Sequence, residues 1–143
     1  MATVDENLVS ALSGVMRSLA KPLARHIAAA GLTPSQFAVL EMLLHKGPRT
    51  VNEIIDGLLS TSGNIGVVID NLIAAGLLEK RPNPADGRSR IISLTAAGDE
   101  KIRAYYPRHR DELGRLMSGV ARAEKKALIK TLIALRRCLE EDA

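Results

Sequence analysis

The feature that most constrains this sequence is a pair of short amphipathic helices followed directly by a basic-tipped hairpin, between residues 50 and 98. The segment from Thr50 to Glu53 has a capping-box pattern, and a second helix start follows the turn residues at 60–64. Strand patterns at 77–81 and 90–94 flank a connection at 82–87 that is rich in turn residues. This order predicts a winged helix-turn-helix.

Longer amphipathic segments surround this unit. Apolar residues recur at helical spacing over 5–30, and a capping box at Thr33 and Gln36 begins a helix that runs through about residue 45. Further helices are expected over 95–118, with a kink or break at Pro107, and over 121–141. The predicted fold class is therefore mainly α, with about six helices and a β-hairpin wing. Residues 1–143 form one domain, with the winged part at 34–98.

Length and composition limit the class of protein. The chain has 143 residues, of which 46% are hydrophobic, which suits one domain with a buried core. It contains no apolar run of the roughly 18 residues that a membrane span requires. Its first residues lack the pattern of a secretory signal, and its single cysteine, Cys138, cannot form an internal disulfide. These features favour a cytoplasmic location.

The basic charge is unevenly distributed. The net charge is +4, but residues 47–98 carry five basic and five acidic side chains, whereas residues 99–143 carry eleven and eight. Overall charge is therefore weak support for nucleic-acid binding. The local cluster matters more, because Lys80, Arg81, Arg88 and Arg90 lie in the strands and the tip of the hairpin, where they could reach phosphates or a groove.

Three of these features together resemble the MarR (multiple antibiotic resistance regulator) family of bacterial transcription factors: the helix pair at 50–75, the Asp-x-Arg at Asp86 and Arg88, and the strand that ends at Leu94-Thr95. The resemblance implies a homodimer built through helices at 5–30 and 99–141. It also implies double-stranded DNA as the partner. A repressor would leave a pseudo-palindromic operator when it binds a small, often aromatic or phenolic, effector; no cofactor is expected.

Candidate DNA-binding residues follow from this geometry. The second helix of such a unit enters the major groove, so residues off its apolar face are available to bases. The resemblance places Arg88 in or beside a minor groove, held by a charge-assisted pair with Asp86. Arg90 and Arg81 could contact DNA or could only pair with Glu79. The alternative is an ordinary solvent-facing helix and a surface ion pair. The helix residues are Ser62, Asn64, Gly66, Val67 and Asn71.

An effector crevice is implied by the resemblance alone. Apolar residues at helical spacing need no ligand to explain them, so each candidate is also a candidate core residue. The seven are Met16, Leu19, Leu23, Phe37, Leu40, Tyr105 and Tyr106.

Two other functions remain open at this stage. The chain could be a protein-interaction module, or a thiol-based redox sensor that acts through Cys138, although a lone cysteine in a helix is more often a packing residue. His26, His45 and His109 lie on different predicted elements, so no metal site is expected. No catalytic constellation is present in the sequence, and an enzyme is not expected.

Overall fold

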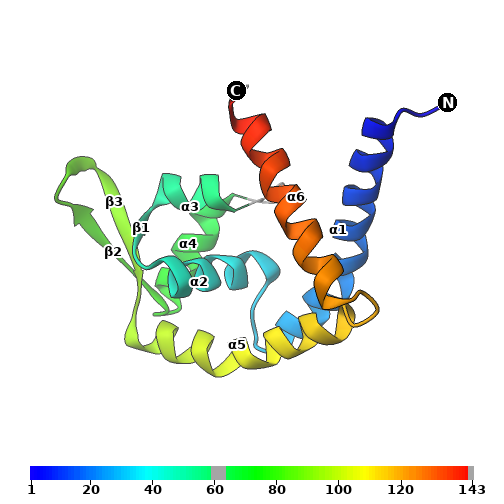
Figure 1. Cartoon of the computed structure of the whole chain (residues 1–143). Helices are drawn as coiled ribbons and strands as arrows, with labels where there is room; N and C mark the ends of the chain where they lie inside the picture. Colours follow the sequence, from blue (N-terminus) through cyan, green and yellow to red (C-terminus); the bar gives the residue numbers. More distant parts are fainter. Residues whose placement is uncertain (59–63, 142–143) are drawn as a thin grey trace. The chain divides into compact units, whose positions relative to one another are not determined.

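The computed structural model describes residues 1–58 and 64–141, which contain six helices and three strands (Figure 1). The predicted fold class is confirmed. Ser62 lies outside the described residues. The chain separates into two compact units, Met1–His109 and Arg110–Ala143, and each is treated by itself.

Capping boxes begin three of the helices in the first unit. The boxes predicted at Thr33 with Gln36 and at Thr50 with Glu53 are both confirmed, and Thr3 with Glu6 forms a third. In each, the threonine hydroxyl accepts from the backbone N–H three residues later while the acidic or amide side chain accepts from the threonine N–H, which satisfies two donors at the helix start. The helices are α1 (Val4–Ala28), α2 (Pro34–Lys46), α3 (Val51–Gly57) and α4 (Ile65–Ala74).

The predicted hairpin is present but differs in extent. Strands β2 (Leu78–Asn83) and β3 (Asp86–Leu94) are longer than expected, so only Pro84 and Ala85 separate them. A short strand that the sequence analysis missed, β1 (Arg49–Thr50), pairs with β3 and makes an antiparallel sheet of order β1-β3-β2. The hairpin projects beyond helices α2 to α4 of its unit (Figure 1).

The core of the first unit draws on all the helices in it and on the hairpin. Predicted apolar positions of α4 are confirmed, because Ile65, Ile69 and Leu72 are buried while Val68 and Ile73 pack against the core. Burial of this stripe fixes which face of α4 points outward. Other buried residues include Ile27, Phe37, Leu40, Ile54, Leu78, Ile92, Ile102 and Tyr105.

Helix α5 (Ala96–Leu116) is continuous through Pro107, where the sequence analysis expected a kink or a break. Proline removes one backbone N–H from the helix. Residues Ile102, Tyr105 and His109, on both sides of Pro107, are buried on one face, so packing holds the helix together across the missing bond. The boundary between the units falls inside α5.

The second unit holds the end of α5 and helix α6 (Arg122–Glu141). No residue of α6 is buried in the single chain. Across the described ranges, every helix is too short or too polar to traverse a lipid bilayer.

Candidate nucleic-acid interface

Helix α4 presents an uncharged outward face at its start. The Asn64 side chain caps the helix by accepting from the Gly66 N–H, at 3.0 Å between Oδ1 and N. Val67 is 52% exposed and Asn71 is also exposed, whereas Ile69, between these two positions, is buried. The cap uses the amide oxygen of the exposed Asn64 side chain, and its Nδ2 group, a donor of two hydrogen bonds, is not needed for the cap.

Gly66 has a structural reason to be glycine. A Cβ at this position would lie 3.0 Å from Oδ1 of Asn64, tighter than ordinary van der Waals contact. A side chain here would therefore press on the oxygen that caps the helix. Gly66 itself is half-buried. The other DNA-binding candidates of α4 that the structure describes, Asn64, Val67 and Asn71, are exposed.

The hairpin tip contains a bulge. Arg81 is paired in register with Ile91 and Pro82 with Arg90, but the next residue, Asn83, is paired with Asp86. Residues 87–89 of β3 consequently have no register partner on β2. A bulge bends the strand and re-aims its side chains, and this one contains Arg88.

A network of short polar side chains holds this bulge. Asn83 Nδ2 donates to Ser89 Oγ at 2.8 Å, and that hydroxyl donates to the Asp86 carbonyl oxygen at 3.2 Å. The Asp86 carboxylate accepts from the Arg88 backbone N–H at 3.0 Å, and Asn83 Oδ1 accepts from Ala85 N at 3.1 Å. The carboxylate of Asp86 thus supports the wing by capping the backbone, not by pairing with the Arg88 guanidinium. Asn83 and Ser89 are members that the sequence analysis missed.

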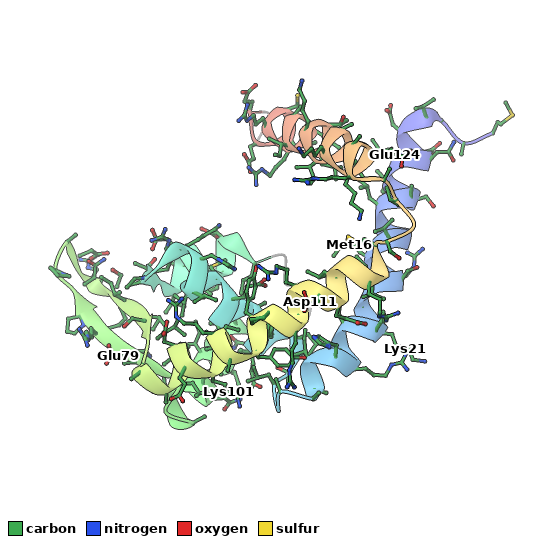
Figure 2. All side chains as sticks on the ribbon, turned by 60° about the horizontal axis from the view of Figure 1, so that its bottom comes forward. Met16, Lys21, Glu79, Lys101, Asp111 and Glu124 are labelled. Carbon is green, nitrogen blue, oxygen red and sulfur yellow. The ribbon has the colours of Figure 1, made fainter. Side chains whose placement is uncertain are left out.

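The other cations of the hairpin are already engaged. Arg81 Nη2 lies 2.5 Å from Glu79 Oε1, the carboxylate labelled in Figure 2, and Lys80 Nζ lies 3.6 Å from Asp70 Oδ1 on α4. Arg90 Nη1 donates to the carbonyl oxygens of residues 87 and 89 at 3.2 Å each. Within the described hairpin, neither a hydrogen bond nor an ion pair holds the guanidinium of Arg88, which is exposed.

A polar hollow of about 310 Å³ lies where the start of α3 meets the hairpin. It brings the Thr50 cap and Asn52 of α3 close to the basic side chains of both strands. The hollow therefore joins hydroxyl and amide groups with cations, the combination that contacts DNA phosphates. Its lining residues are Thr50, Val51, Asn52, Lys80, Asp86, Arg88, Ser89 and Arg90.

Helix α5 is fixed closely to the end of α4. The Thr95 hydroxyl donates to the Gly76 carbonyl at 2.6 Å and accepts from the Gly98 N–H at 3.0 Å, and the Thr95 N–H donates to the Leu77 carbonyl at 3.1 Å. Thr95 therefore caps the start of α5. A Cβ on Gly98 would lie 2.0 Å from the Leu77 oxygen. Only glycine permits this approach of α5 to the segment that leads from α4 into the hairpin.

The candidate effector residues occupy different environments in the single chain. Phe37, Leu40 and Tyr105 belong to the core, and Leu23 and Tyr106 pack against it. Met16, labelled on α1 in Figure 2, is 59% exposed, and Leu19 is half-buried. One surface hollow includes Tyr105 and a second includes Tyr106, each without the other six candidates. The predicted crevice therefore stays a prediction.

Two other features were considered in the sequence analysis. Cys138 is exposed on α6 as a free thiol. In the part of the chain that the structure describes, no three His, Cys, Asp or Glu side chains are grouped so that they could hold a metal ion.

Comparisons with known proteins agree with this geometry. A family model described as the MarR family matches residues 30–89. Two regulators of Bacillus subtilis strain 168 are similar in sequence. The uncharacterized HTH-type transcriptional regulator YkoM is 35% identical over 88% of this chain and 82% of its own length, and the HTH-type transcriptional regulator MhqR is 34% identical over 79% and 78%.

Solved structures show the same fold. A mutant of MarR from E. coli complexed with operator DNA has a TM-score of 0.78 at 22% identity, covering 90% of this chain and 93% of that one. The organohalide-sensing regulator RdhR in its 2,4-dichlorophenol-bound form has a TM-score of 0.79 at 19% identity, covering 96% of this chain and 82% of that one.

Proposed function

This chain belongs to the MarR family of transcriptional regulators, and we propose that it binds double-stranded DNA as a homodimer and represses transcription from a pseudo-palindromic operator. Such a regulator acts in the cytoplasm. The observation that carries the proposal is the unengaged guanidinium of Arg88, which a rigid bulge holds at the end of the hairpin. A cation that no protein group holds is available to a phosphate or to the negative potential of a narrow minor groove.

Helix α4 would supply the base contacts. Its exposed Val67 can touch a thymine methyl, and the amides of Asn64 and Asn71 can donate to base edges. The described part of α4 has no Lys or Arg, and its Asp70 is paired with Lys80 of β2. The repulsion that Asp70 would cause near phosphate is thereby reduced. The fold of the E. coli MarR structure with operator DNA supports this arrangement.

The homodimer is supported by exposed apolar residues on the helices near both ends of the chain. On α1, Val9, Val15 and Met16 are exposed by 64%, 57% and 59%. On α6, Leu128 and Ile129 are exposed by 55% and 56%. Large apolar side chains at this density on helices normally mark an interface. Two copies would present two α4 helices to half-sites about 34 to 36 Å apart.

An effector of small aromatic type would release the operator. RdhR has been solved with 2,4-dichlorophenol bound, and we extend a ligand of this chemical class to the present chain. Release then requires only that the ligand binds one conformation of the dimer better than the other.

The central test is an electrophoretic shift with DNA fragments from beside the gene of this protein. The wild type should form a sequence-selective complex at moderate salt, and Arg88→Ala should weaken it by about 1 to 3 kcal/mol per contact that is lost. Circular dichroism should show that the variant is folded. A folded Arg88→Ala protein with unchanged affinity removes Arg88 from the interface, and no selective complex with any fragment favours a protein-interaction module instead.

A further inference from the structure

A pair of histidines in the first unit, His109 buried and His26 half-buried, has no role in the DNA contacts proposed above. His109 on α5 is 5% exposed, and its ring lies 6.0 Å from that of His26 on α1 between ring centroids. The His26 Nε2 and His109 Nδ1 atoms are both buried, and among the residues that the structure describes neither has a hydrogen-bond partner. An unpartnered buried nitrogen is costly, and it is far more costly when its ring carries a charge.

Aromatic rings surround this pair. Phe37 of α2 lies 4.4 Å from His109 and Tyr105 lies 5.1 Å from His26, between ring centroids. The Tyr105 hydroxyl donates to the His26 carbonyl oxygen, which ties α5 to the end of α1. The cluster therefore joins three helices through neutral rings, and a positive charge inside it would face an apolar environment.

The two influences that shift the pKa of the His109 imidazole are its burial and a second imidazole. His26 faces His109 from α1, and burial followed by repulsion from His26 lowers the pKa of the His109 imidazole. On α2, His45 contacts Tyr106, and the half-buried Glu41 has its pKa raised by burial, with an opposing influence from His45.

The other charged residues of α5 near the cluster lie beside a surface hollow or in an ion pair on the helix. Lys101 and Arg108 line a surface hollow beside Tyr105, and Glu112 is held by two bonds from Arg115, at 2.8 and 2.6 Å. Two of these groups are cations, which oppose a further positive charge nearby.

We propose that the His26–His109 pair is an acid-labile lock that holds α5 against α1 and α2, and that its protonation loosens α5 and releases the operator. The second part rests on the proposed function. The connection to DNA runs through the start of α5, because Thr95, which precedes that helix, is bonded to Gly76 and Leu77, which follow α4. A displacement of α5 therefore acts on the helix that would read the bases.

The direction of the pH effect follows from linkage. An imidazole whose pKa is lowered by folding binds fewer protons in the native state than in the unfolded chain. The stability that it contributes is complete above the ordinary histidine pKa of about 6.5 and is lost as the pH falls below that value. Acidification should therefore weaken the lock, whereas alkaline conditions should leave it unchanged.

The test compares melting temperature and operator affinity between about pH 7.5 and about pH 5. In the wild type, we expect the melting temperature to fall by about 2 to 4 °C and the operator Kd to rise about tenfold over this range. His109→Phe replaces the imidazole by a ring that suits the apolar cluster and cannot be protonated, so most of both changes should disappear. His45→Gln is the matched control, because His45 is exposed, and it should keep the wild-type profile.

A direct titration protects the test against a variant that fails to fold. NMR of the wild-type imidazole protons should give His109 a midpoint below about 6.5. A midpoint at or above the ordinary value overturns the lock, as does a His109→Phe protein with the wild-type pH profile. A melting temperature that falls while operator affinity stays constant overturns the connection to DNA. Melting and titration need no DNA, so they decide the lock even if no operator is bound at any pH.

Discussion

Helix α4 and the hairpin that follows it are both proposed to meet DNA, but different interactions hold them. Helix α4 is positioned by apolar burial, with Ile69 and Leu72 each only 1% exposed. The hairpin tip is positioned by hydrogen bonds among Asn83, Asp86 and Ser89, all close together in the chain. The charges also differ, since the described part of α4 has no Lys or Arg and the tip carries Arg88. Selectivity and salt-dependent affinity should therefore reside in separate elements.

The largest effect is expected from a substitution at Gly98, where α5 packs against the segment that joins α4 to the hairpin. Gly98→Ala would push a Cβ into the Leu77 backbone oxygen, at 2.0 Å, where no flexible side chain can yield. We expect a loss of about 3 kcal/mol in the free energy of unfolding, measured in urea. Gly114→Ala is the matched control in the same helix, because no atom of residues 1–58 or 64–141 outside that helix's own backbone lies within 4 Å of the added Cβ. It should gain up to about 1 kcal/mol. Equal changes in the free energy of unfolding for the two variants would contradict the close approach of α5 to the Leu77 backbone.

The next largest effect is on the salt dependence of DNA binding, which should distinguish Arg88 from Arg81. Arg88→Ala should lower the slope of log K against log salt by about 1 per protomer, because one phosphate contact is lost. Arg81→Ala should change the slope much less, since Arg81 is already paired with Glu79. The measurement is fluorescence anisotropy with one operator fragment over a series of salt concentrations. Equal slopes for the two variants would argue against a special role for the bulge.

A smaller effect tests how Asp86 supports the tip. Asp86→Ala removes the acceptor for the Arg88 N–H and should weaken operator binding by about 1 kcal/mol through a less ordered bulge. Asp86→Asn retains an acceptor oxygen and removes a negative charge near DNA, so its affinity should equal or exceed that of the wild type. If an ion pair between Asp86 and the Arg88 guanidinium were the important contact, Asp86→Asn would weaken operator binding as much as Asp86→Ala. The same anisotropy assay distinguishes these results.

The smallest effect concerns α4. Val67→Ala shortens an exposed apolar side chain and should reduce affinity for the operator by about 1 kcal/mol or less, with an unchanged salt slope. Binding to unrelated DNA should stay constant. The ratio of specific to non-specific affinity is the quantity to measure, and a loss of both together would assign Val67 to structure.

Local patterns predicted most of the fold. The capping boxes at Thr33 and Thr50 and the apolar stripe of α4 depend on residues three or four apart, so the sequence alone displays them. Strand β1 is different, because it has two residues and exists only through pairing with β3. Pro107 does not break α5, which was one of the two expected outcomes, because burial of its neighbours outweighs the cost of the missing N–H.

The site was harder to predict than the fold. The position of Arg88 at the hairpin tip could be inferred, but its unengaged guanidinium could not, because that depends on the partners taken by Arg81 and Arg90. Asn83 and Ser89 were missed for a related reason. Their bond crosses the hairpin and requires the register shift after Pro82, for which the composition of the turn gives no signal.

The bonds from Thr95 to Gly76 and Leu77 have an evolutionary consequence. They join the residues just before the hairpin to the residue just after it, so the two ends of the intervening segment are held close together. Lengthening such a loop at its far end costs only a slowly growing closure entropy, about 0.6 kcal/mol for each doubling. Insertions at Pro84 and Ala85 can therefore extend the reach of the hairpin along DNA without shifting α4 or α5, which lets the length of the wing diversify independently of the helix that reads the bases.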